Sequence, residues 1–578
     1  MAKVAVWAPN CNNAGLVLNG SLKPFHKAGF GYWTLWAADI KPGDRYKFSI
    51  DGKLFPDPAS RAQPDGVHEA SMVINLNDFN WTDESWQNPP MEKYVIYELH
   101  TGTFTPEGTF EAIITKLDHL LNLGITAIEI MPVAQFPGNR NWGYDGVFPY
   151  AVQNSYGGAA GLMRLVDACH QKGIAVILDV VYNHIGPEGN YFNEYGPYFT
   201  DKYHTPWGDA VNFDDAWCDE VRHFFIQNAL QWFRDFHIDA LRLDAVHAIK
   251  DFSPRHVLKE LKENADRLMQ ETGRKHHLII EFDLNDKRFI DPVDQDGYGM
   301  DAQWIDEFHH ALRVTAGGGQ DGYYSDFNGI VHLAKAYNDA YVYDGIYSPH
   351  RLKTFGTKTG NPGRQFIAFS QNHDQVGNRM LGERSSKLFS FEMQKLMVGA
   401  VLVSPFVPML FMGEEWAESN PFLYFVSHTD PELVEAVRKG RRAEFAAFHA
   451  EGETPDPQAE ETFNLSKLSW NKPELGLHAI MLNYYKALIA LRKQIPALAT
   501  LNRQNVKTTV DEPANILLLE RWEKDTHIGC LMNFSGKALA TTIHNENILL
   551  NSANSQWGGP GVEDGVIQPQ SIIIYHHV

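Results

Sequence analysis

The middle of this 578-residue chain repeats one pattern, in which a short apolar run is followed by a stretch with helical periodicity. Apolar runs without polar alternation are typical of strands buried on both faces, as in a parallel sheet that helices cover. One helical stretch carries apolar side chains from Phe110 to Leu121 and stops at Gly124, a natural C-cap. Eight such units in about 400 residues predict an α/β fold, a (β/α)8 TIM barrel with inserted loops. The runs lie at 95–99, 125–133, 174–181, 238–243, 278–282, 300–305, 366–370 and 408–412.

The two ends of the chain follow a different pattern. Residues 1–88 contain short strand-like runs separated by Pro, Gly, Asn and Asp, and predict an N-terminal β-sandwich of the carbohydrate-binding-module type. Residues 498–578 return to short strands and predict a C-terminal all-β domain. The barrel domain is therefore expected at 89–497, with inserted loops at about 183–217 and 311–363.

Three tryptophans of the N-terminal segment have two alternative roles. Trp7, Trp33 and Trp36 could form a platform that stacks on sugar rings. Their alternating positions along predicted strands favour packing in the core of the sandwich. A carbohydrate-binding role for this domain therefore stays open.

The charge and cysteine content exclude several classes of partner and compartment. The net charge of −21, from 50 basic and 71 acidic residues, argues against nucleic acid and against anionic membranes. The four cysteines are scattered and form no CxxC pair, which favours reduced thiols over a disulfide framework or a zinc site. The N-terminus has no secretion-signal pattern, and no apolar run approaches the length of a membrane span. Together these features predict a cytoplasmic protein with a neutral substrate.

Polar motifs follow four of the predicted barrel strands at the point where each strand ends. These are DVVYNH at 179–184, LRLDAVH at 241–247, Glu281 after an apolar run, and QNHD at 371–374. In such barrels the reacting groups gather at the C-terminal ends of the strands. A single Asp there is usually a helix cap, but three acids brought together for structural reasons alone would repel one another strongly. The pattern therefore predicts a carboxylate site at the barrel mouth.

These four motifs resemble, in order and spacing, the four sequence regions of the α-amylase superfamily (glycoside hydrolase family 13), and the resemblance covers nearly the whole chain. It implies a retaining glycosidase, in which one carboxylate attacks the sugar and a second, about 5–5.5 Å away, protonates the leaving oxygen. By this resemblance Asp244 is the nucleophile and Glu281 the acid/base. Asp374, with His373, is expected to hold the ring hydroxyls of the sugar at the cleavage point.

Other residues of the motifs are expected to support this chemistry. Arg242, two residues before the nucleophile on the same strand face, can keep the carboxylate of Asp244 ionised. An apolar strand and two nearby anions should raise the pKa of Glu281 toward working pH. The resemblance implies that His184 contacts the same sugar and that Tyr144, in WGYDG, stacks below it. Packing within the loop is the alternative for Tyr144.

No metal and no cofactor is predicted. Asn183 is a calcium ligand in many α-amylases, but the neighbouring insert has no obvious cluster of carboxylates to complete such a site. Asp179 is expected to be a structural partner within its motif. The residues beside the acid depart from the family pattern, since Ile280 and Phe282 stand where small or polar residues are usual. This departure concerns the details of the subsite and not Glu281 itself.

Several longer stretches resemble one subgroup, the maltooligosyltrehalose trehalohydrolases. The resemblance implies hydrolysis of the α-1,4 bond next to the terminal trehalose of maltooligosyltrehalose, which releases α,α-trehalose in trehalose biosynthesis alongside a maltooligosyltrehalose synthase. His247 replaces part of a Lys-His pair of many α-amylases on the leaving-group side, and Asp306, Phe308 and His309 of DEFHH are expected to add contacts there. Among these stretches are 57–61, 63–68, 198–208, 306–310, 322–326, 371–379 and 421–425.

Two other functions are compatible with parts of the sequence. A glycogen branching or debranching enzyme of the same superfamily would also carry an N-terminal sandwich, but the stretches DEFHH and GYYSDF argue against it. A catalytically dead glycan-binding homologue would be expected to lack at least one carboxylate. Asp244, Glu281 and Asp374 are all present, which favours the enzyme.

Overall fold

The computed structural model of the chain describes residues 2–447 and 454–577, and its centre is a closed barrel of eight parallel strands. Each strand coincides with one of the eight apolar runs, so the predicted TIM barrel is confirmed. Around the barrel the strands are β9 (Ile96–Leu99), β10 (Ala127–Ile130), β13 (Ala175–Val180), β16 (Ala240–Leu243), β17 (His277–Ile280), β18 (Ala302–Trp304), β21 (Phe366–Ala368) and β22 (Val407–Phe411), which pairs with β9.

The barrel interior explains why polar groups collect at one end of it. Alternate residues of a strand point to the same face, and the inward-facing residues of the lower layers form a separate apolar cluster that includes Ile96, Ala127, Ile177, Ala240 and Ile279. Two residues further along the same strands, the same face carries charged side chains instead. These are Glu98, Glu129, Asp179, Arg242 and Glu281.

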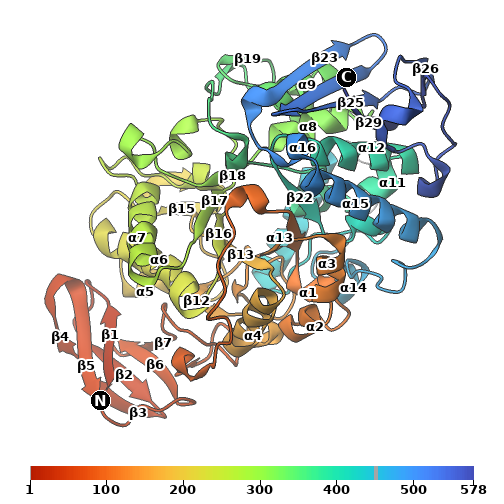
Figure 1. The fold of residues 1–578 in the computed structure, drawn as a ribbon. Helices are drawn as coiled ribbons and strands as arrows, with labels where there is room; N and C mark the ends of the chain where they lie inside the picture. The colour runs from red at the N-terminus through yellow and green to blue at the C-terminus, as the bar shows by residue number, and fades with distance from the viewer. Residues whose placement is uncertain (1, 448–453, 578) are drawn as a thin grey trace.

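Helices surround the barrel, as Figure 1 shows. The helical stretch predicted from Phe110 forms two helices, α2 (Phe110–Ile114) and α3 (Leu117–Leu123), and α3 ends at Gly124 in the left-handed conformation (φ 101°), as predicted. Other helices are α4 (Gly158–Gln171), α6 (Cys218–Asp235), α7 (Val257–Thr272), α8 (Asp306–Thr315), α9 (Gly329–Asp339), α12 (Phe391–Leu402), α13 (Pro431–Ala447) and α15 (Gly476–Gln494). Across the described residues no helix is long and apolar enough to cross a membrane.

The two segments expected to be inserted loops contain regular structure. The first holds a hairpin of β14 (Phe199–Thr205) and β15 (Gly208–Val211). The second holds the end of α8, all of α9 and a hairpin of β19 (Ile346–Ser348) and β20 (Lys353–Phe355).

The N-terminal segment consists of two antiparallel sheets that lie at one side of the barrel (Figure 1). Trp7 and Trp33 are buried in its core, whereas the side chain of Trp36 is exposed. Trp7 also packs edge-on against Tyr198 of the barrel domain, with ring centroids 5.1 Å apart. The sheet strands are β1 (Ala2–Trp7), β4 (His26–Lys27) and β5 (Tyr32–Ala37), and β2 (Ala14–Leu18), β3 (Ser21–Pro24), β6 (Arg45–Ile50) and β7 (Lys53–Phe55).

The C-terminal segment is built on a five-stranded antiparallel sheet, so both predicted β regions are present. The sheet lies against helices on one side of the barrel, and Asn338 at the end of α9 donates to the hydroxyl of Thr508 over 2.7 Å. In sheet order the strands are β23 (Val506–Asp511), β24 (Ile516–Glu523), β25 (Thr526–Asn533), β29 (Ser571–His576) and β27 (Ile548–Asn551).

Candidate active site

A single guanidinium group joins the carboxylates at the mouth of the barrel. Arg242 is completely buried, and its Nη1 lies 2.8 Å from Asp179 Oδ2 and 2.9 Å from Asp244 Oδ1. Its Nη2 lies 3.3 Å from Glu281 Oε2 on the neighbouring strand. The indole ring of Trp304 lies against the guanidinium, 4.3 Å from ring centre to Cζ. Asp244 and Glu281 therefore share one cation.

The backbone after Asp244 adds a second link between the two acids. Ala245 adopts the left-handed conformation (φ 38°, ψ 50°), which is strained for a residue with a side chain. This turn directs its N–H to Glu281 Oε2, at 2.6 Å. Asn183 donates to the second oxygen of Asp244 over 2.9 Å, so both oxygens of that carboxylate are held.

The surroundings of Glu281 favour its protonated form. Burial raises its pKa well above the ordinary value, and Asp244, Asp374 and Asp306 add to this rise, while Arg242 opposes it. The direction of the shift agrees with the prediction from the sequence. A carboxyl group that holds its proton at neutral pH can donate it to a leaving group.

His373 and Asp374 begin the short helix α10 (His373–Gly377) on the other side of the mouth. His373 Nδ1 donates to Glu98 Oε1 at 2.5 Å, and its Nε2 lies 2.8 Å from the hydroxyl of Tyr144 and 3.6 Å from Asp374 Oδ2. Burial opposes the charged imidazole, but Asp374 and Glu98 outweigh it and raise the pKa of His373 to about 9. Asp374, with 37% of its side chain exposed, faces the cavity.

Glu98 was not predicted as a site residue. It accepts both from the ring of His373 and from the His373 backbone N–H, at 3.0 Å. It lies within the apolar run of the first barrel strand, and a carboxylate on the inward face of such a run was the available signal.

Tyr144 and His184 lie beside this group. The Tyr144 ring stacks on His373, with centroids 5.3 Å apart, and its hydroxyl donates to Asp179 at 2.6 Å. His184 donates from Nε2 to the Tyr144 carbonyl at 2.9 Å and stacks on the ring of Trp207, 4.4 Å away and nearly parallel. Trp207 is half exposed and belongs to the first insert, so its aromatic face was not assigned from the sequence.

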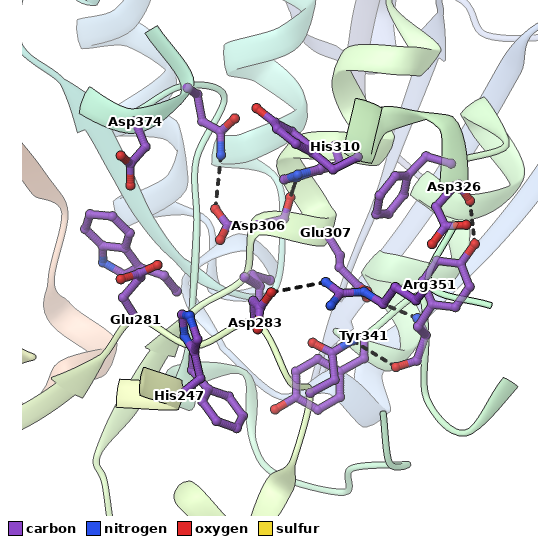
Figure 2. Close-up of a pocket in the computed structure, with 18 of the residues that line it drawn as sticks. His247, Glu281, Asp283, Asp306, Glu307, His310, Asp326, Tyr341, Arg351 and Asp374 are labelled. Carbon is purple, nitrogen blue, oxygen red and sulfur yellow. Dashed lines mark hydrogen bonds and ion pairs between the residues drawn. The ribbon is translucent and has the colours of Figure 1, made fainter. Parts of the chain in front are cut away.

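A cavity of about 310 Å³ opens beside Glu281 and Asp374 (Figure 2). Figure 2 shows these two acids at one end of the cavity, with Arg351 and Asp326 toward the other. His247 and Asp306 line the cavity, as the predicted leaving-group contacts require. Burial, followed by Asp374 and Asp283, raises the pKa of Asp306 to about 7.

Two predicted contacts from the DEFHH stretch do not reach this cavity. Phe308 is fully buried against Tyr337 and Phe406, with ring centroids 5.2 and 6.0 Å away. His309 is buried and donates from Nδ1 to the carbonyl of Ser370 at 2.8 Å. Residues i and i+4 of a helix share a face, so Asp306 and His310 line the cavity while Phe308 points into the core.

A family model of the α-amylase catalytic domain matches residues 53–209. The chain is 49% identical to a malto-oligosyltrehalose trehalohydrolase of Saccharolobus solfataricus over 85% of this chain and 84% of that one. It is 45% identical to one of Arthrobacter ramosus over 85% and 87%. A crystal structure of a putative α-amylase from Salmonella typhimurium superposes with a TM-score of 0.91 at 38% identity, covering 99% of this chain and 97% of that one.

Proposed function

Because this chain belongs to the malto-oligosyltrehalose trehalohydrolases, a family of α-amylase-type glycoside hydrolases, we propose how its own residues carry out that reaction. The enzyme hydrolyses the α-1,4 bond next to the terminal trehalose of maltooligosyltrehalose and releases α,α-trehalose. The family predicted from the motifs is confirmed, and the branching and debranching alternatives are less well supported.

In the first step Asp244 attacks the anomeric carbon and the bond to the trehalose oxygen breaks. Glu281 gives its proton to that oxygen, so trehalose leaves as a neutral alcohol. In the second step water attacks the glycosyl ester, Glu281 takes a proton from the water, and Asp244 is released as the carboxylate. The observation that carries this proposal is the contact of both carboxylates with the buried guanidinium of Arg242.

The sugar at the cleavage point is expected to lie over Tyr144 and to be held by its neighbours. His373, charged below about pH 9 and anchored by Glu98, keeps a positive group beside Asp374. Asp374 can then accept hydrogen bonds from two ring hydroxyls and favour the flattened, cationic sugar of the transition state. His184, stacked on Trp207, borders the same space.

The trehalose unit is expected in the cavity beside Glu281. Its lining combines aromatic rings with carboxylates, imidazoles and the guanidinium of Arg351 around a space of about 310 Å³. His247 and Asp306 line the cavity close to Glu281 (Figure 2) and are proposed to contact the trehalose unit. Such groups recognise hydroxyls by hydrogen bonds, which discriminate strongly against ligands that lack them.

The setting of the enzyme is also proposed from the sequence. We propose a cytoplasmic enzyme, since its four cysteines are all free, and one that acts after a maltooligosyltrehalose synthase. We also propose that the chain has three domains, at residues 1–88, 89–497 and 498–578.

The experiment that tests the function compares three substrates: maltooligosyltrehalose, plain maltooligosaccharide and branched glucan. We expect free trehalose from the first alone, and comparable cleavage of plain maltooligosaccharide would contradict the assignment. Asp244→Asn and Glu281→Gln should each abolish turnover without changing the melting temperature greatly. Glu111→Gln, which removes an exposed carboxylate of α2, is the matched control and should remain active.

A further inference from the structure

One side of the C-terminal sheet brings together two imidazoles and a carboxylate that the proposed reaction does not use. Glu520 lies on β24, His527 on β25, and His577 immediately follows β29, near the C-terminus in Figure 1. His577 N–H donates to the carbonyl of His527 at 2.9 Å, so the two histidines are direct cross-strand neighbours. Glu520 pairs with Gly529, two residues beyond His527, which places all three side chains on the same face.

The distances between their ligand atoms suit one small cation. Glu520 Oε1 lies 3.2 Å from His577 Nε2 and 3.6 Å from His527 Nε2. All three atoms lie within 4.8 Å of one another. Zinc bonds of about 2.0–2.1 Å in tetrahedral geometry separate neighbouring ligand atoms by roughly 3.3 Å. Two of the three separations are thus already close to those of a zinc site.

The side chains around the cluster hold it in place. Gly529 has no side chain, and a Cβ there would lie 2.3 Å from the ring of Tyr575. The Tyr575 ring therefore fills this position and packs beside His577, with ring centroids 5.9 Å apart. Lys507 pairs with Oε2 of Glu520 at 3.3 Å, which leaves Oε1 directed at the histidines.

The cluster also has an unsatisfied polar atom. Nε2 of His527 is buried and has no hydrogen-bond partner among the residues described. A nitrogen lone pair that faces a carboxylate oxygen is unfavourable unless a proton or a cation lies between them. From these contacts we propose that Glu520, His527 and His577 bind a divalent transition-metal ion of the zinc class, with a fourth position open to water.

One rearrangement accompanies binding. The two imidazole rings are stacked 4.5 Å apart and are nearly parallel, at 9°, so their lone pairs do not meet at one point. Rotation of one ring about its Cβ–Cγ bond, a soft torsion, directs both nitrogens to the ion. The bound ion joins the last strand to β24 and β25 and so stabilises the end of the chain.

The test uses the full chain without a polyhistidine tag, treated with a chelator and titrated with Zn²⁺ by calorimetry. We expect about one Zn²⁺ per chain, and a rise in melting temperature with Zn²⁺. His527→Ala and His577→Ala should each weaken binding by roughly tenfold or more and abolish the rise. His544→Ala is the matched control, because His544 in the same domain pairs with a single carboxylate, Asp564, among the described residues.

A further variant distinguishes a metal site from a cluster held together by ion pairs alone. Lys507→Ala removes a competing cation, so binding of Zn²⁺ should be equal or tighter, and a loss of binding would overturn the proposal. Absence of saturable binding, or binding that survives both histidine substitutions, would also overturn it. Trehalose release should be unchanged in all four variants, so this test is independent of the proposed reaction.

Discussion

The Glu98→Gln substitution tests whether Glu98, which lies beneath the active site, controls the charge of His373. Glu98 is buried and accepts two hydrogen bonds from His373, one from the ring and one from the backbone. Glutamine keeps the size of the side chain but removes its charge. We therefore expect the pKa of His373 to fall from about 9 toward its ordinary value of 6.5.

The size of the effect follows from that difference. A pKa near 9 in place of 6.5 corresponds to about 3 kcal/mol in favour of the charged imidazole, shared between Asp374 and Glu98 after the cost of burial. Because the folded pKa is the higher one, this stabilisation is complete below pH 6.5 and is lost as the pH rises through 9. In the variant, where the pKa of folded His373 should lie near its ordinary value of 6.5, this stabilisation should be absent at every pH.

The assay is a pH series of kcat/KM on maltooligosyltrehalose, with the melting temperature measured at each pH. At about pH 8 the variant should be roughly tenfold less active than the original enzyme, and this difference in activity should narrow below pH 6, where His373 is charged in both proteins. The difference in melting temperature should instead be largest below pH 6.5 and should disappear as the pH rises through 9. Glu129→Gln is the control, because Glu129 pairs in register with Glu98 and burial raises its pKa well above the ordinary value, which favours its neutral form. If the activity profile does not move to lower pH relative to this control, and the melting temperature at pH 6 is not lowered, Glu98 does not set the charge of His373.

Three further substitutions test other parts of the structure. Glu418→Gln should lower the free energy of unfolding, measured with urea at pH 7, by roughly 3 kcal/mol. Burial opposes the carboxylate of Glu418, but a contact with Lys472 and backbone donors lower its pKa to about 2. The difference in stability between variant and original should therefore shrink as the pH falls from 4.5 toward 2. Gly363→Ala places a Cβ 1.9 Å from a carbonyl oxygen, so it should lower the free energy of unfolding by on the order of 2 kcal/mol and reduce the melting temperature. Gly360→Ala is its control, because open space surrounds that position and the melting temperature should be unchanged. Trp207→Ala should raise KM roughly tenfold with a smaller change in kcat, since it removes the ring on which His184 stacks; an unchanged KM would place the sugar elsewhere.

The barrel was predictable because its strands are buried on both faces and therefore appear as unbroken apolar runs. The position of the acids at the barrel mouth was predictable because Asp244 and Glu281 directly follow such strands, and Asp374 lies four residues beyond the run at 366–370. The position of Glu281 beside Arg242 needed no more than the parallel register of two adjacent strands.

Other contacts depended on geometry that the sequence does not display. Phe308 and Asp306 belong to one short motif, yet the helical rotation of α8 sends one to the core and the other to the cavity. Trp207 reaches His184 only because its hairpin folds back over the mouth. The cluster of Glu520, His527 and His577 depends on the register of three strands, so the scattered spacing of its members gave no metal signal.

The shared contact of Arg242 has a consequence for how the enzyme can be altered. Three carboxylates, those of Asp179, Asp244 and Glu281, meet at one buried guanidinium, so a change in the charge of one acid changes the field on the others. Substitutions within this group should be non-additive in double-mutant cycles. A shift of the pH optimum is therefore better engineered through Glu98, which contacts His373, than by changing Asp244 or Glu281.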